Sequence, residues 1–133
     1  MQWSEMQRKA IEIKGKNVLV AAAAGSGKTA VLVERIVQRI QKRECDVDEI
    51  LVVTFTNAAA AEMRERIEGA LQKALEKEPG NLHLQKQLVL LHAASISTLH
   101  AFCQSVIRQN FHLLDLDGRF RLGTQQEMEL LQR

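Results

Sequence analysis

The stretch Ala22-Ala23-Ala24-Gly25-Ser26-Gly27-Lys28-Thr29 decides the fold class of this chain. Its small residues, with glycine at 25 and 27, allow backbone N–H groups to curve around an anion. The lysine is placed to reach the β- and γ-phosphates of a nucleoside triphosphate, and the threonine hydroxyl to ligate Mg²⁺. Ala22 stands where the usual pattern has glycine, and it keeps the turn if its φ angle stays negative. The pattern predicts a phosphate-binding loop rather than a chance glycine-rich turn.

The segments on both sides of the loop have the character that such a loop requires. Residues 17–22 contain the apolar run Val18-Leu19-Val20, which predicts a buried strand before the loop. After the loop, apolar residues recur at the spacing of one helix face, namely Val33, Ile36, Val37 and Ile40. The loop therefore opens a helix, and the positive end of the helix dipole favours phosphate binding there.

The rest of the chain alternates apolar runs with helical patterns. The run Ile50 to Val53 predicts a parallel strand covered on both faces, and residues 95–98 predict a third strand. The remaining expectations are a strand over 119–122 and helices over 4–13, from an N-cap at Asn57 to the break at 79–81, over 82–93, over 99–113, and after the capping box of Thr124 and Glu127. We predict an α/β fold with parallel strands flanked by helices. Because the strands are few and the last helix is still running at Arg133, we expect the front piece of a longer protein.

Composition adds limits rather than a function. The net charge is +2 and 46% of the residues are hydrophobic, so any contact with nucleic acid must depend on a few placed groups. Cys45 and Cys103 have no metal-ligand spacing and are expected to be reduced thiols. No apolar run approaches the roughly 20 residues that span a bilayer, and the start lacks the features of a signal peptide. We expect a cytoplasmic protein that makes no membrane contact.

Polar and aromatic residues follow two of the predicted strands. In parallel α/β sheets the carboxyl ends of strands carry the ligand-binding loops. Hydroxyl, amide and imidazole groups bond phosphates, and an aromatic ring stacks on a base, as single-stranded DNA binding requires. From the residues alone three other interpretations stay open: Asn57 as a helix cap, Phe55 as a core residue and His100 as a buried histidine. The candidate DNA contacts are Thr54, Phe55, Thr56, Asn57, Thr98 and His100.

Three motifs, taken in order, resemble the first RecA-like domain of superfamily 1 DNA helicases: the loop at 22–29, TFTNAAAAEMRERI at 54–67 and ISTLHAFC at 96–103. More narrowly, the opening at 3–7, the alanine-rich second motif and HLLDLDGRFRL at 112–122 are similar to the AddA subunits of bacterial AddAB helicase–nucleases. The resemblance covers nearly the whole chain. It implies the N-terminal portion of a RecA-like phosphate-loop NTPase domain over 1–133, in a protein that uses ATP and Mg²⁺. It also implies contacts with single-stranded DNA and double-strand ends, an AddB-like partner subunit, and a role in recombinational repair.

The resemblance assigns roles to matching positions. Gln7 matches the glutamine that reads the adenine edge, and residues 22–29 match the nucleotide loop, in which Lys28 and Thr29 serve catalysis and Thr29 holds Mg²⁺. The positions that match DNA contacts are Thr54, Phe55, Thr56, Asn57, Thr98, His100 and Phe102. Two alanines depart from the wider family, in which many members have a lysine at the position of Ala58 and an arginine at that of Ala30. The resemblance implies that Ala58 removes one phosphate contact and that Ala30 weakens a nucleotide contact. Both alanines are typical of the AddA branch.

The chain lacks the Asp-Glu pair that hydrolysis needs after an apolar strand. Asp48-Glu49 precedes its strand, and Asp115 and Asp117 follow a helix, so both sets are interpreted as solvated turn carboxylates. We therefore expect nucleotide binding without turnover. A small phosphate-loop kinase is the alternative enzyme, which the second and third motifs disfavour. A stand-alone nucleotide-binding module is the alternative from another class.

Overall fold

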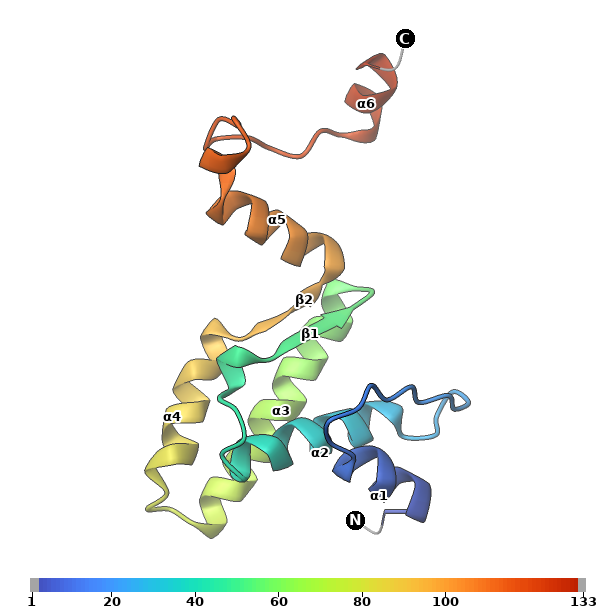
Figure 1. The fold of residues 1–133 in the computed structure, drawn as a ribbon, viewed down its shortest axis with the longest axis vertical. Coiled ribbons are helices and arrows are strands. Elements are labelled where there is room, and N and C mark those ends of the chain that lie inside the picture. The colour runs from blue at the N-terminus through green and yellow to red at the C-terminus, as the bar shows by residue number, and fades with distance from the viewer. Residues whose placement is uncertain (1–2, 132–133) are drawn as a thin grey trace. The chain divides into compact units, whose positions relative to one another are not determined.

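The computed structural model describes residues 3–131, which belong to two compact units, Met1–Leu99 and His100–Arg133 (Figure 1). The first unit contains the phosphate-loop pattern and both strands. Its elements are α1 (Glu5–Glu12), α2 (Lys28–Gln41), the short 3-10 helix η1 (Val47–Glu49), β1 (Leu51–Thr54), α3 (Asn57–Lys77), α4 (Leu82–Leu90), η2 (Leu91–Ala93) and β2 (Ser95–Thr98). The elements that follow are α5 (Leu99–Gln109), η3 (Phe111–Leu113) and α6 (Gln125–Leu131).

The sheet of the first unit consists of β1 and β2, which pair in parallel. Val52 lies opposite Ile96 in the register, and both are buried. The 21-residue helix α3 packs on both strands, so the two residues face a core that α3 supplies with Met63, Ile67 and Leu71. The predicted α/β fold, with parallel strands flanked by helices, is confirmed.

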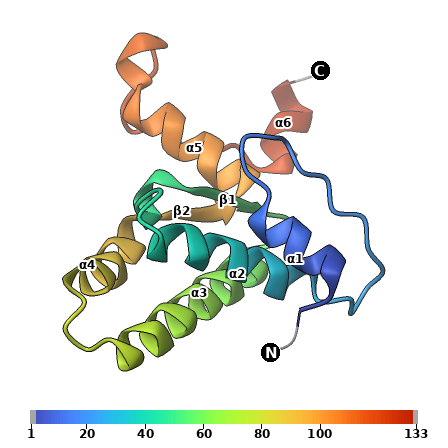
Figure 2. The same ribbon diagram turned by 60° about the horizontal axis from the view of Figure 1, so that its bottom comes forward.

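Helix α2 completes this core, and its first residues are also the last residues of the loop at 22–29. The predicted apolar face is confirmed, because Val33, Ile36, Val37 and Ile40 are all buried. Figure 2 shows α2 between α1 and α3, and both of these helices pack against it. Since α2 begins at Lys28, its packing fixes the position of the loop's last residues.

The predicted strand over 17–22 is wrong. These residues have no regular structure, and Val18, Leu19 and Val20 are exposed, Leu19 to 95%. A strand is stable only when a neighbour takes its backbone hydrogen bonds, and in the described part of the chain the sheet consists of β1 and β2 without a third strand. Apolar β-branched composition therefore did not suffice here, because strand formation depends on pairing.

Two further expectations in the first unit need correction. The run at 50–53 is covered on one face only, since Leu51 and Val53 are 47% and 44% exposed. The N-cap of α3 is Thr56 rather than Asn57, because the Thr56 hydroxyl accepts from the Ala59 N–H at 3.1 Å. Either residue type suits that position, and the hydroxyl has the geometry.

The second unit confirms one local prediction and overturns another. Thr124 and Glu127 form the expected capping box at the start of α6, where the Thr124 N–H donates to Glu127 Oε2 at 2.7 Å. The predicted strand over 119–122 is wrong, because the Phe120 N–H donates to the Asp117 carbonyl at 2.9 Å in a turn. Asp117 Oδ1 also accepts from the Arg119 N–H at 2.9 Å, and such local side-chain bonds favour turns over ladders.

Across residues 3–131, no helix combines the length and the apolar character needed to span a bilayer.

Candidate nucleotide-binding site and strand-end loops

The loop backbone turns at its two glycines. Gly25 and Gly27 have φ angles of 77° and 84°, in the left-handed region that glycine adopts without strain. Ala22 is not among the described residues with positive φ, so the condition for an alanine at that position is met. The Ser26 N–H donates to the Ala23 carbonyl at 3.3 Å and closes the turn ahead of α2. The loop thus ends at a helix N-terminus, where N–H groups have no intrahelical partners.

Lys28 lies at the first position of α2 and folds onto the loop. Its Nζ donates to the Ala22 carbonyl at 2.5 Å and to the Ala23 carbonyl at 3.0 Å. The ammonium is exposed, so an incoming phosphate can exchange these carbonyls for charged oxygens. Such charge-assisted bonds are roughly twice as strong as bonds between neutral groups. The residue therefore has both the charge and the access that phosphate binding needs.

Gln7 contacts the loop directly, although it lies 19 positions before Ser26 in the chain. Its Nε2 donates to the Ser26 carbonyl at 3.3 Å, and its Oε1 accepts from the Ser4 N–H at 2.9 Å. The second bond belongs to the capping box that begins α1, in which the Gln7 N–H donates to Ser4 Oγ at 3.2 Å. The structure thus places the predicted adenine-reading amide beside the phosphate loop.

A divalent cation at this site would rely on few protein ligands. Thr29 is exposed in the first turn of α2, and its hydroxyl is the hard oxygen donor that Mg²⁺ prefers. Among the described residues, no group of three or more His, Cys, Asp or Glu side chains is arranged to hold a metal. Since Mg²⁺ usually keeps several waters and binds substrate phosphates, one hydroxyl beside the loop fits its needs.

The carboxylates near β1 lie at the wrong end of the strand for hydrolysis. Asp48 and Glu49 belong to η1, which precedes β1, as predicted. Glu49 Oε2 accepts from the Asp46 N–H at 2.8 Å, so this carboxylate caps a turn. The residues at the carboxyl end of β1 are instead Thr54, Phe55 and Thr56.

The first strand-end motif presents an exposed aromatic ring. Phe55 is fully exposed, which excludes its alternative interpretation as a core residue. Thr54 Oγ1 donates to the Thr56 carbonyl at 2.9 Å, and the Thr56 hydroxyl caps α3, so both hydroxyls shape the loop that carries Phe55. Asn57 is exposed at the first position of α3.

The register of the sheet brings the two strand ends together at one pair of residues. Thr54 of β1 lies opposite Thr98 of β2. The next candidates, His100 and Phe102, belong to α5 in the second unit, in which His100 is exposed and Phe102 partly buried. The exposure of His100 excludes its interpretation as a buried histidine. That Phe55 and His100 line one groove stays a prediction.

The sequence patterns do not single out Arg64, which acts at the opposite end of β2, where that strand begins. The guanidinium of Arg64 on α3 bonds the carbonyls of Leu91, Ala94 and Ile96, the second at 3.1 Å and the third at 3.4 Å. It thereby ties the entry of β2 to α3. In the sequence, only the position of Arg64 could have indicated this role, since it follows the buried Met63 and precedes the buried Ile67 by about one helical turn.

The parallel sheet, its covering helices and the glycine-rich loop that opens α2 define an α/β domain of the phosphate-loop NTPase class. Within that class, the chain belongs to the UvrD/REP helicase N-terminal domain family, whose sequence model matches residues 3–133.

Individual proteins that the chain matches show which branch of this family it resembles. The chain is 60% identical over 134 residues to the AddA subunit of an ATP-dependent helicase/nuclease from Clostridium perfringens (strain 13 / Type A), a match that covers 99% of this chain and 11% of that protein. It is 60% identical over 131 residues to the protein of the same name from Bacillus licheniformis, covering 97% and 11%. The Clostridioides difficile protein of that name is 58% identical over 134 residues, covering 99% and 10%. The chain thus spans about a tenth of the length of the curated relatives it matches.

Proposed function

We propose that this chain binds Mg·ATP through the loop at 22–29 and is the ATP-binding portion of an ATP-dependent DNA helicase–nuclease. The observation that supports this most strongly is the contact between Gln7 and Ser26, because it puts an amide that can pair with adenine beside the phosphate loop. The similarity to AddA proteins, whose name describes an ATP-dependent helicase/nuclease, supports the choice of ATP. As a resident ion, Mg²⁺ would screen the phosphate charge, held by Thr29 and the phosphates themselves.

The chain's own residues would share the work of binding. Lys28 would exchange the Ala22 and Ala23 carbonyls for β- and γ-phosphate oxygens. The N–H groups at the start of α2 would face the same phosphates with the helix dipole behind them. Gln7 would exchange its bonds to Ser4 and Ser26 for a paired donor and acceptor contact with the adenine edge.

For the whole protein we propose unwinding and processing of double-strand DNA ends for recombinational repair, in the cytoplasm and with an AddB-like partner. The exposed Phe55 ring supports contact with single-stranded DNA, because an exposed aromatic ring is a stacking platform for a base. In this proposal six further residues contribute polar and packing contacts to the single-stranded DNA, namely Thr54, Thr56, Asn57, Thr98, His100 and Phe102. The positions of Asp48 and Glu49 ahead of β1 support a narrower role for this chain itself, which is nucleotide binding without turnover.

Two measurements test this proposal, calorimetry for nucleotide binding and a phosphate-release assay for turnover. Calorimetry should show that the chain binds Mg·ATP, while multi-turnover phosphate release stays at background with and without single-stranded DNA. Binding that survives chelation of Mg²⁺ unchanged, or no binding at all, would count against the proposed site.

A further inference from the structure

The C-terminal end of α1 is held by α2. Helix α1 has eight residues, too few for stability on its own, and Ile11 is its buried residue. The last carbonyls of a helix have no partner within it. Arg35 of α2 supplies one here, because its Nη1 donates to the Ala10 carbonyl at 2.6 Å and to the Ile11 carbonyl at 3.1 Å. A cation at this end is also favoured by the helix dipole.

The carbonyls that Arg35 bonds lie one helical turn after Gln7. Ala10 and Ile11 follow Gln7 by three and four residues, which is the length of a turn. At its other end, α1 meets the loop through the bond from Gln7 to Ser26. Helix α1 therefore has a bond at each end to one continuous segment, the loop and the helix α2 that follows it, and α1 lies beside α2 in Figures 1 and 2.

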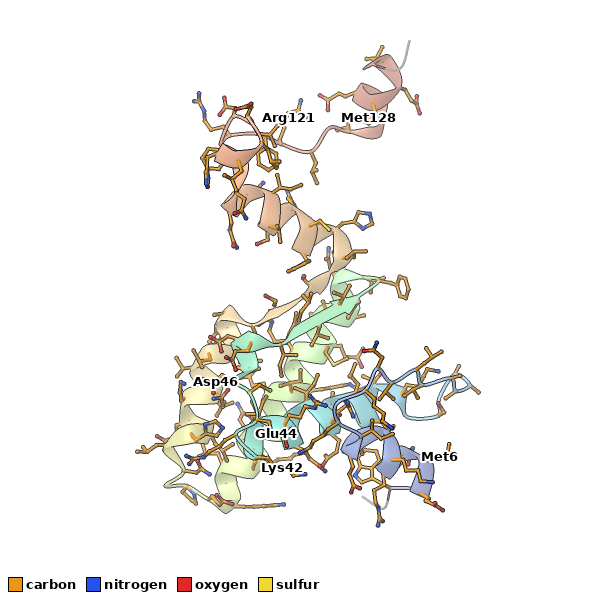
Figure 3. The ribbon with its side chains drawn as sticks, in the orientation of Figure 1. Met6, Lys42, Glu44, Asp46, Arg121 and Met128 are labelled. Atoms are coloured by element: carbon orange, nitrogen blue, oxygen red, sulfur yellow. The ribbon has the colours of Figure 1, made fainter. Side chains whose placement is uncertain are left out.

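Two other polar contacts lie at the C-cap of α1 and beyond it. Arg39 Nη2 donates to the Ile13 carbonyl at 3.5 Å, and Lys14 pairs with Glu44 in the connection after α2, where Figure 3 labels Glu44. In the described part of the chain, Arg35 is the residue of α2 that bonds carbonyls inside α1. Both bonds come from one nitrogen of its partly buried guanidinium, Nη1, so a lysine at this position could keep part of the contact.

We propose that Arg35 is a positioning residue that sets the place of Gln7 beside the phosphate loop, and thereby the preference of the chain for adenine over guanine nucleotides. This inference rests on the proposed function, since it assigns to Arg35 the base selectivity of that same site. Arg35 acts through α1 and makes no contact with the nucleotide. Loss of its bonds would let α1 shift, so that the Gln7 amide leaves its place while the loop keeps its own.

The test separates the base from the phosphates. Calorimetry measures the affinity of the purified chain for Mg·ATP, Mg·GTP and Mg·tripolyphosphate, in the wild type and in Arg35→Met, Arg35→Lys, Gln7→Ala and the double variant Arg35→Met/Gln7→Ala. Arg39→Met is the matched control, because it removes an arginine of α2 whose bond lies outside α1. Circular dichroism and thermal unfolding check that each variant is folded.

We expect Arg35→Met to weaken Mg·ATP about 10-fold, within the range of a lost paired contact to a base, and to leave Mg·tripolyphosphate unchanged. The ATP preference should fall to that of Gln7→Ala, the double variant should lose nothing more, Arg35→Lys should restore part of it, and Arg39→Met should keep it. Unchanged selectivity in Arg35→Met would overturn the inference. Equal losses of ATP and tripolyphosphate would do the same, because Arg35 would then support the loop as a whole.

The wild type distinguishes this failure from that of the proposed function. If the wild type does not bind Mg·ATP, the proposed site is wrong and the inference falls with it. If it binds with a preference that Gln7→Ala abolishes and Arg35→Met retains, the proposed site stands and the inference alone is wrong. Should Arg35→Met not fold, Arg35→Lys and Arg35→Gln provide the same comparison.

Discussion

The Nε2 of Gln7 donates to the carbonyl of Ser26 across 3.3 Å, so the side chain that caps the first helix also contacts the phosphate loop. Because Gln7 Oε1 accepts from the Ser4 N–H, both ends of the amide already have partners. Adenine binding would therefore be an exchange of hydrogen bonds, and its net contribution is the difference between the two sets. Guanine offers a different pattern at the same edge, so the exchange would favour adenine.

Substitution of this glutamine tests the exchange. We expect Gln7→Ala to weaken Mg·ATP more than Mg·GTP, by roughly 1–3 kcal/mol, the range for paired side-chain contacts that discriminate between bases. Competition between the two nucleotides, followed by calorimetry, measures the difference. Part of the capping box is lost as well, so thermal unfolding of the variant serves as the control for α1. A ratio of ATP to GTP affinity equal to that of the wild type would leave Gln7 with only its capping role.

The exposed ring at the end of β1 gives the second prediction. Phe55→Ala should weaken binding of single-stranded DNA by about 1–3 kcal/mol, because base–aromatic stacking has that magnitude. The ring is fully exposed, so its removal should leave the unfolding free energy of the chain unchanged. Fluorescence anisotropy with a labelled oligonucleotide measures the affinity, and Leu82→Ala, which removes another exposed apolar side chain, is the matched control. Equal losses in the two variants would contradict a specific role for Phe55.

Local patterns predicted much of this fold. The helix after the loop and the capping box of Thr124 and Glu127 were predictable, because each depends on residues that lie close together in the chain. The residue pattern located the loop, the family resemblance singled out Gln7, and the structure brings the two into contact.

The two wrong strand predictions share one physical cause. Residues 17–22 and 119–122 have strand-like sequences, yet a strand depends on a distant partner that its own residues do not specify. For the same reason Arg35 and Arg64 drew no attention, since their partners are backbone carbonyls more than 20 positions away. Composition identifies which side chains can donate hydrogen bonds, but tertiary contacts decide which backbone groups accept them.

The capping box of α6 gives a prediction about pH. Hydrogen bonds from Arg121, and then from the Thr124 backbone, lower the pKa of Glu127 to about 2. Because the folded pKa lies below the ordinary value near ~4.3, the stabilisation is complete above that value and is lost as the pH falls through about 2. An NMR titration of the Glu127 carboxyl carbon measures the midpoint, and Arg121→Met should raise it. A midpoint at the ordinary value in the wild type would show that the contact does not persist in solution.

The fourth prediction concerns the turnover of ATP. Among residues 3–131, no Asp or Glu directly follows β1 or β2 along the chain, where hydrolysis needs a carboxylate to orient water. An arginine from a second domain usually adds roughly 10³–10⁵ in rate. We therefore expect the chain to release no phosphate above background when single-stranded DNA is added. Release that rises with DNA and disappears in Lys28→Ala would contradict this, and would mean that Asp48-Glu49 or the carboxylates at 115–117 take part in hydrolysis.

Binding of Mg·ATP by the phosphate loop is the central claim, and Lys28→Ala tests it most directly. Lys28 Nζ now bonds the Ala22 and Ala23 carbonyls, and its transfer to phosphate oxygens would form charge-assisted bonds of about 1.5–3 kcal/mol each. Calorimetric titration of Mg·ATP into the wild type and the variant measures the difference, with thermal unfolding as the check on the fold. We predict measurable binding by the wild type and a loss of at least that magnitude in Lys28→Ala, whereas equal affinities in the two proteins would contradict the proposed role of the loop.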